Sequence, residues 1–170
     1  AIMRALPNVV ILSPADCTAT VKATIAAAGI DAPVYLRLTG SMNNPIVYKE
    51  DFDFEIGKAI ELRQGDDVAI IATGSMVHCA LKAAEHLEAM GISASVLDMH
   101  TIKPLDADII YRAARETGAI VTAEEHSVIG GLGSAVAEVT ATHCPVKMAM
   151  VGQQDTFGES GKPDELKVKY

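Results

Sequence analysis

Short apolar runs alternate with segments of helical periodicity through most of this chain, and no other feature restricts its fold as strongly. The runs are rich in Val, Ile and Ala and are bounded by turn residues, which is typical of strands buried on both faces. The expected strands are residues 68–73, 93–98, 119–123 and 146–150. The expected helices between them are residues 75–90, 106–117 and 132–143. Because strands separated by such helices form parallel βαβ units, the sequence predicts an α/β fold, a three-layer sandwich around a mostly parallel sheet.

The segment before the first of these runs predicts an edge strand. Residues 54–62 alternate polar and apolar side chains, as a half-exposed strand does. A turn signal at 64–67, containing Gly65 and two Asp residues, then precedes the apolar run at 68–73. The sequence therefore predicts a hairpin that adds one antiparallel edge strand to the sheet.

The first 40 residues predict a smaller α/β unit, with strands at 9–12 and 33–38. Ser13 followed by Pro14 signals the start of a helix, and Gly29 signals its end. The face of this helix expected to be buried carries Cys17, Val21, Thr24, Ile25 and Ala28.

The chain is expected to divide into two parts. Residues 41–53 are rich in Asn, Ser and other turn-forming residues and form the predicted linker. Residues 1–40 are then the incomplete tail of one α/β domain, and residues 54–170 form a complete second domain. Because the chain opens on what reads as the last turns of a helix, without Met, we expect residue 1 to be a truncation point.

Composition excludes several classes of protein. A formal net charge of −8 argues against a nucleic-acid partner, which requires Lys and Arg to neutralise phosphates. No apolar stretch is long enough for a membrane span, and no secretory signal opens the chain. The three cysteines are too far apart for a disulfide framework or a paired metal site, so we expect small buried thiols in a cytoplasmic protein.

Residues 130–134, which we call the glycine loop, lie between a predicted strand and a predicted helix. Backbone N–H groups at a helix N-terminus bind anions, so the loop is a candidate anion site. Its spacing is neither a dinucleotide fingerprint nor a P-loop, and a tight turn that lets helix and strand approach closely remains the alternative. The residues concerned are Gly130, Gly131, Gly133 and Ser134.

Two further groups carry chemistry. Glu124 and His126 lie near the end of a predicted strand, where alternate residues share a face, so they form either a proton-transfer pair or a structural cluster. Arg37 lies in an otherwise apolar predicted strand, near its C-terminal end, and is expensive to bury unless paired. Its guanidinium is suited either to a phosphate or to an ion pair with a carboxylate. No residues have the spacing of a zinc site, so we expect no metal site.

Seven stretches, taken in order, resemble the C-terminal part of transketolases: the end of the pyrimidine-binding domain followed by the C-terminal domain. They are residues 1–8, 13–16, 34–37, 69–75, 103–106, 124–133 and 160–163. In that family the strand that resembles residues 34–37 ends in an Arg that contacts the substrate's sugar phosphate, so the resemblance implies this role for Arg37. Where some members carry a second Arg three residues later, this chain has Gly40.

The resemblance implies an enzyme of the pentose phosphate pathway that transfers a two-carbon ketol unit between sugar phosphates with thiamine diphosphate and magnesium. The family's diphosphate-binding domain, its activating Glu and its catalytic His residues have no counterpart in these 170 residues. We therefore expect this chain alone to contribute no catalytic residue, to be inactive and to bind no cofactor. Its expected roles are scaffold and dimerisation, as a homodimer or with a complementary N-terminal transketolase region or subunit. The alternative is a regulatory small-molecule or nucleotide-binding module that uses the glycine loop.

Overall fold

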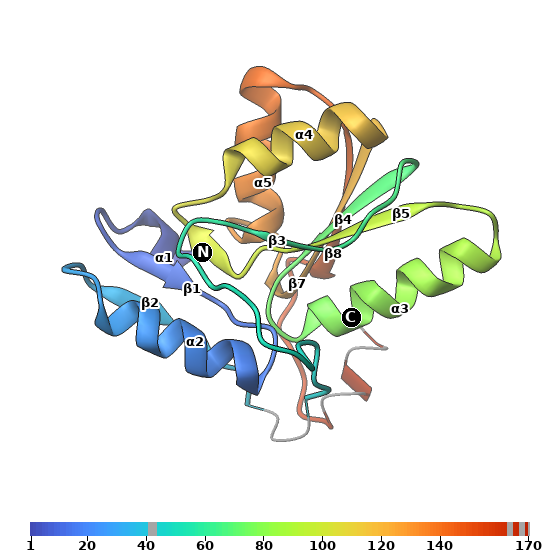
Figure 1. Cartoon of the computed structure of the whole chain (residues 1–170). Helices are drawn as coiled ribbons and strands as arrows, with labels where there is room; N and C mark the ends of the chain where they lie inside the picture. The colour runs from blue at the N-terminus through green and yellow to red at the C-terminus, as the bar shows by residue number, and fades with distance from the viewer. Residues whose placement is uncertain (41–43, 163–164, 167–168, 170) are drawn as a thin grey trace.

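The computed structural model describes residues 1–40, 44–162, 165–166 and 169, and its elements follow the predicted α/β order (Figure 1). The helices are α1 (Ile2–Ala5), α2 (Cys17–Ala28), α3 (Met76–Ala89), α4 (Ala107–Thr117) and α5 (Leu132–His143). The strands are β1 (Val10–Leu12), β2 (Val34–Leu36), β3 (Ile60–Arg63), β4 (Val68–Ala72), β5 (Ala94–Asp98), β6 (Thr101–Lys103), β7 (Ala119–Ser127) and β8 (Lys147–Gln153). None of the helices in these described segments is long and apolar enough to cross a membrane.

The main sheet has the strand order β3-β5-β4-β7-β8, and β5, β4, β7 and β8 are parallel. Strand β3 is an antiparallel edge strand, as predicted, but it begins at Ile60 and leaves residues 54–59 outside the sheet. The predicted hairpin is wrong, because β3 pairs with β5 and not with β4. The turn between β3 and β4 instead crosses the start of β5, where a Cβ on Gly65 would lie 2.3 Å from the backbone of Ala94.

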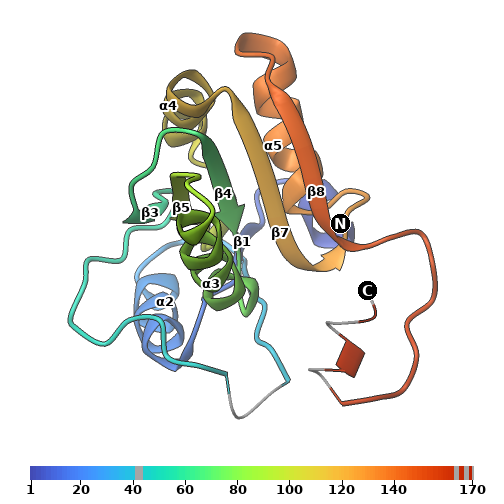
Figure 2. The same cartoon turned by 90° about the vertical axis from the view of Figure 1, so that its right-hand side faces the viewer.

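Helices cover the main sheet on both faces and complete the three layers (Figure 2). Helix α3 packs on one face against Ile70 and Val96, and helices α4 and α5 pack on the other against Ile71 and Leu97. Neighbouring residues of a strand point to opposite faces, so one apolar run supplies both cores. The carboxyl ends of β4 and β7 remain the open edge of this arrangement.

A second sheet joins the first part of the chain, residues 1–40, to the second part, residues 54–170. Its order is β2-β1-β6, with β1 and β2 parallel and β6 antiparallel to β1. Strand β6 was not predicted, because three residues following a longer strand carry too weak a pattern. Through β6, residues 1–40 share a sheet with the segment that follows the linker.

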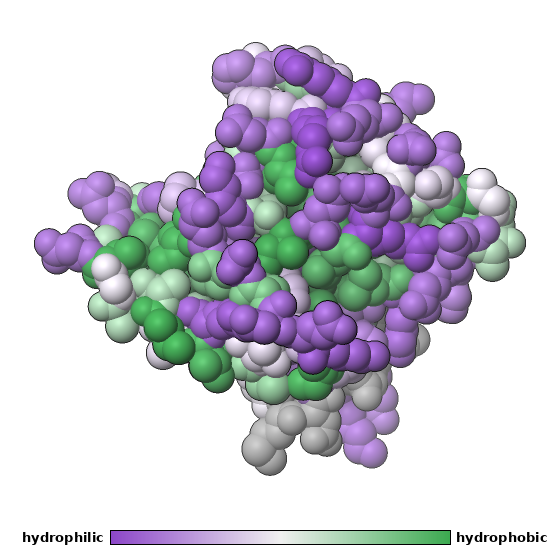
Figure 3. All heavy atoms as spheres, in the orientation of Figure 1, coloured by the Kyte–Doolittle hydropathy of each residue, from purple (hydrophilic) through white to green (hydrophobic). Residues whose placement is uncertain are grey.

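Helix α2 differs from the prediction in its N-cap and in its buried face. Its N-cap is Asp16 and not Ser13, because the Asp16 Oδ1 atom accepts the N–H of Ala19 at 2.8 Å. Its buried residues are Ala19 and Ala23, whereas Val21 and Ile25 are 59% and 68% exposed. These apolar side chains contribute to the hydrophobic surface over α2 (Figure 3).

The described part of the linker, residues 44–53, is bound to both parts of the chain. The Asp16 Oδ2 atom accepts the backbone N–H groups of Val47 and Tyr48 at 2.7 and 2.9 Å. The buried Tyr48 side chain stacks on Phe52 and donates its hydroxyl to Asp98 Oδ2 at 2.6 Å. One carboxylate therefore caps α2 and also anchors the linker.

Candidate functional site

The candidate site is a cavity of about 630 Å³ between the first part of the chain and the carboxyl ends of β4 and β7. Open α/β sheets bind ligands at this edge, because loops there diverge from the strands. The polar side chains that line the cavity are Arg4, Ser13, Arg37, Thr73, Glu124, Glu125, His126, Ser127 and Asp155. The structure thus brings Arg37, Glu124 and the glycine loop, which were separate in the sequence, to one cavity.

Arg37 follows β2, and its backbone N–H continues the ladder to Leu12 at 2.8 Å. Its Nη2 atom donates to the main-chain oxygen of Glu125 at 2.7 Å. No carboxylate within the described segments forms an ion pair with Arg37, so the structural ion pair that the sequence left open is not found there. A carbonyl orients the guanidinium without cancelling its charge.

The loop between β4 and α3 closes one side of the cavity. The Thr73 hydroxyl donates to the carbonyl of Met99 at 2.9 Å, and the Gly74 N–H donates to the carbonyl of Ser13 at 3.2 Å. Gly74 has φ +57°, and a Cβ there would lie 3.0 Å from Ser13 Oγ. The next side chain, Ser75, donates its hydroxyl to the carboxylate of Glu125. This loop is thereby bound to three segments of the chain.

Glu124 lies beneath the glycine loop and is only 4% exposed. Its Oε2 and Oε1 atoms accept the backbone N–H groups of Leu132 and Gly133 at 2.7 and 2.8 Å. The anion at this helix N-terminus is therefore an internal carboxylate. A Cβ on Gly131 would lie 2.0 Å from Glu124 Oε2, so the loop needs glycine for close packing. Ligand binding by the loop stays a prediction, and an added anion would have to displace Glu124.

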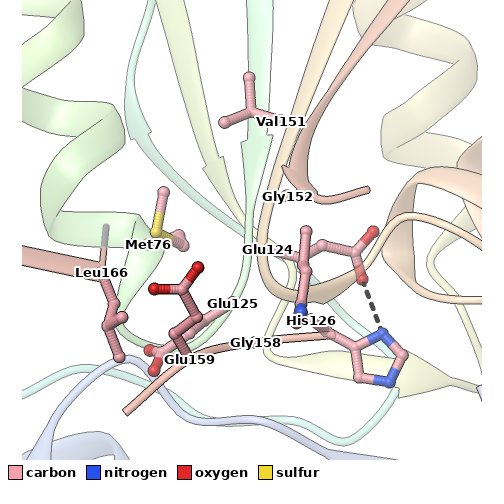
Figure 4. A pocket seen from close by; sticks show the side chains of 10 residues that line it. Met76, Glu124, Glu125, His126, Val151, Gly152, Gly158, Glu159 and Leu166 are labelled. Carbon is pink, nitrogen blue, oxygen red and sulfur yellow. Dashed lines mark ion pairs between the residues drawn. The ribbon is translucent and has the colours of Figure 1, made fainter. Parts of the chain in front are cut away.

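His126 lies on the same side of β7 as Glu124, as its spacing predicted. Its Nδ1 atom is 2.7 Å from the carbonyl oxygen of Ser127 and 3.7 Å from Glu124 Oε2 (Figure 4). Because a carbonyl only accepts, the short contact assigns the proton to Nδ1. The pair belongs to the hydrogen-bonded structural cluster that was one of the two predicted alternatives.

A second cavity of about 340 Å³ lies beside the first and shares the wall formed by Glu124, Glu125 and His126. Figure 4 shows the Glu125 and Glu159 carboxylates on the side of Met76 and Leu166, with His126 on the other side. The C-terminal segment thus contributes Gly158, Glu159 and Leu166 to this cavity. Pro163, which ends the stretch 160–163 that resembles transketolases, lies outside the described residues.

Two buried ionisable groups close to the site were not found from the sequence. Asp98 is fully buried, and this burial raises its pKa to about 7 although the hydrogen bond from Tyr48 lowers it. His100 stacks on Phe54 at 4.1 Å, and burial lowers its pKa to about 4. Asp98 ends an apolar run, and that position was the one signal in the sequence that could have indicated a buried carboxylate.

The described residues contain no group of three or more His, Cys, Asp or Glu side chains that could hold a metal ion. The three cysteines are free, and the prediction that all are buried is wrong, because Cys17 is exposed at the start of α2.

Comparison with known proteins finds a matching family model and several relatives. Residues 57–170 match the family described as "Transketolase, C-terminal domain". A 6-deoxy-6-sulfo-D-fructose transketolase subunit of Clostridium sp. (strain MSTE9) is 47% identical over 99% of this chain and 52% of its own length. A putative transketolase C-terminal section of Methanocaldococcus jannaschii is 46% identical over 100% of this chain and 53% of its own. The chain thus spans about half the length of these relatives.

Solved structures agree with this match. A structure titled "Split gene transketolase, inactive beta4 tetramer" superposes with a TM-score of 0.96 at 50% identity, over 99% of this chain and 55% of that one. A transketolase of Campylobacter jejuni has a TM-score of 0.66 at 22% identity over 99% of this chain and 25% of that one, a likeness of fold alone.

Proposed function

This chain belongs to the transketolase family, and from that premise we propose that it is the C-terminal part of an enzyme that transfers a two-carbon ketol unit between sugar phosphates. Within that enzyme it supplies a scaffold and one substrate ligand. The observation that carries the proposal is Arg37, held at the cavity of about 630 Å³ by a carbonyl that leaves its charge unbalanced.

Arg37 binds the phosphate group of the substrate in this proposal. A guanidinium offers several donors in a rigid fork that matches the oxygen atoms of a phosphate. The cavity beside it is large enough for a sugar phosphate, since small-molecule sites typically enclose about 300–1,000 Å³. The Ser13 and Thr73 side chains line the same cavity and supply further polar contacts.

Thiamine diphosphate with magnesium, bound to the complete enzyme, would supply the carbanion stabilisation that transfer of a ketol unit requires. The residues described here do not fit that group, because they contain no carboxylate and histidine cluster for the metal. The N–H groups at the start of α5 are also already bonded to Glu124. We therefore expect the cofactor to be held by another part of the enzyme.

A complementary transketolase region or a second copy of the chain is the expected partner. One relative is described as a subunit, and another is titled a split gene product in an inactive tetramer. The exposed Val21 and Ile25 side chains of α2 favour such an association, because apolar side chains of this size gain from burial.

A coupled transketolase assay with saturating cofactor and magnesium tests the proposal. The purified chain alone gives no turnover, and adding the N-terminal part of the enzyme gives activity. In that assembly, Arg37→Ala raises KM for a phosphorylated acceptor sugar by roughly 10- to 100-fold, as expected for a lost hydrogen bond to a charged group. It leaves KM for the unphosphorylated sugar unchanged.

Arg112→Ala is the matched control, because Arg112 forms an ion pair with Glu61 on the surface. It should leave both KM values unchanged. Turnover by the chain alone, or an equal effect of Arg37→Ala on the two sugars, would contradict the proposal.

A further inference from the structure

We propose that Ser75 is a positioning residue for Arg37, acting through Glu125, so that the C-terminal domain sets how well the enzyme holds the substrate phosphate. This inference rests on the proposed function, because it assumes that Arg37 binds that phosphate. It assigns a role in substrate binding to a domain otherwise expected to serve as a scaffold.

Two consecutive hydrogen bonds join Ser75 to Arg37 through Glu125. The Ser75 hydroxyl donates to the Glu125 carboxylate, and the Glu125 carbonyl accepts from Arg37 Nη2 at 2.7 Å. Ser75 is almost buried, at 6% exposed, so its hydroxyl has little water to replace this partner. The line crosses from the start of α3 to β7 and then to the end of β2.

Ser75 occupies a helix N-cap without capping the helix. A Ser at this position usually accepts a backbone N–H of the first turn, which stabilises the helix by about 1 kcal/mol. Here the backbone of Ser75 is helical, with φ −59° and ψ −19°, and its side chain makes no capping bond. The hydroxyl donates to the Glu125 carboxylate instead, and a hydrogen bond to a charged group offsets the missing cap.

The backbone around Glu125 needs an anchor of this kind. The register between β7 and β8 shifts between Ala123 and Ser127, so regular pairing with β8 is interrupted at Glu125. Irregular strand positions change the direction of the neighbouring peptide groups. The bond from Ser75 fixes the Glu125 side chain and thereby the carbonyl that orients Arg37.

Ser75 also keeps the Glu125 carboxylate away from Arg37. That carboxylate lies on the Met76 and Leu166 side of the smaller cavity (Figure 4). None of the ion pairs within the described residues joins it to Arg37. Without the Ser75 hydroxyl, the carboxylate is free to turn and pair with the guanidinium. It would then compete with the substrate phosphate for the same donors.

Steady-state kinetics of the assembled enzyme test this inference with phosphorylated and unphosphorylated acceptor sugars. Ser75→Ala raises KM for the phosphorylated sugar about tenfold, which corresponds to the loss of one hydrogen bond to a charged group, and leaves kcat within about twofold. The conservative Ser75→Thr keeps KM near the wild-type value. Ser75→Ala/Glu125→Gln recovers most of the lost affinity, because the competing charge is gone.

Ser95→Ala is the control, since Ser95 is buried to the same degree at 5% and does not line the cavity. The inference is overturned if Ser75→Ala behaves like this control. It is also overturned if Ser75→Ala changes KM equally for the two sugars, because a general structural effect does not distinguish a phosphate.

A second measurement on this chain alone separates the inference from the proposed function. Nitrogen-15 NMR of the Arg37 side chain shows restricted motion in the wild type and faster motion in Ser75→Ala. If Arg37→Ala fails to discriminate the two sugars while Ser75→Ala still releases Arg37, the phosphate role is wrong and the positioning contact stands. If Arg37 motion is the same in both proteins, the positioning role is wrong by itself.

Discussion

The Asp98→Asn substitution tests how a buried carboxylate on β5 affects stability. Asp98 is fully buried, its Oδ2 atom accepts the Tyr48 hydroxyl at 2.6 Å, and its Oδ1 atom has no hydrogen-bond partner among the described residues. Burial disfavours the charged form and raises the pKa from 3.8 to about 7. An Asn has nearly the same shape, can still accept from Tyr48, and carries no charge at any pH.

Proton binding by Asp98 in the folded and unfolded states decides whether the free energy of unfolding falls or rises with pH. Between pH 3.8 and about 7 the folded protein keeps the Asp98 proton and the unfolded chain releases it. The stabilisation is therefore complete below the unfolded pKa and is lost as the pH rises through the folded pKa. At about 1.4 kcal/mol per pH unit, this interval sets an upper bound of about 4 kcal/mol on the loss.

Urea unfolding followed by circular dichroism between pH 4 and pH 8 measures the effect, since the chain has no Trp for fluorescence. We expect the free energy of unfolding of Asp98→Asn to rise relative to wild type across this range and to level off above pH 7. His100, whose pKa is lowered, contributes an opposite slope, but it is present in both proteins. Exposed Asp53→Asn is the control. Parallel pH profiles for Asp98→Asn and wild type would refute the reasoning.

Three further substitutions or additions have defined outcomes. Tyr48→Phe leaves the Asp98 carboxylate without its donor and lowers the free energy of unfolding at pH 7 by about 1–3 kcal/mol, measured by urea unfolding. Gly131→Ala places a Cβ against Glu124 and destabilises by about 1–3 kcal/mol, whereas Gly40→Ala, with nothing within 4 Å, leaves Tm unchanged. A nucleoside triphosphate leaves Tm unchanged in a thermal-shift assay, because Glu124 already accepts the N–H groups of the glycine loop. A rise in Tm that Gly131→Ala abolishes would instead favour the regulatory module.

The sequence predicted correctly those helices and strands whose signals lie within one short segment of the chain. Helix α5 spans the predicted residues 132–143, because its apolar periodicity and the preceding glycines are contained in one short segment. The pairing of β3 with β5 was mispredicted, because a turn signal at 64–67 does not reveal that a later strand inserts beside it. The cap of α2 was misplaced for a similar reason. Ser13 and Asp16 are both good caps, and contacts of Asp16 with the linker decide between them.

The candidate site was only partly predictable. Arg37 was recognised as unusual because a charge in an apolar run needs a reason, but its partner is a main-chain carbonyl 88 residues away. No side-chain pattern identifies such an acceptor. The Ser75 contact with Glu125 and the Tyr48 contact with Asp98 each join segments 50 residues apart, so they depend on the tertiary fold.

The antiparallel pairing of β1 with β6 affects how the chain would respond to cleavage. A protease cut within residues 44–53 would sever the backbone between the first part and the last, yet β1 would keep its hydrogen bonds to β6. The Lys103 Nζ atom would also still donate to the carbonyls of Arg4 and Leu6. We expect the two fragments to co-purify as a nicked complex and to separate only when denatured.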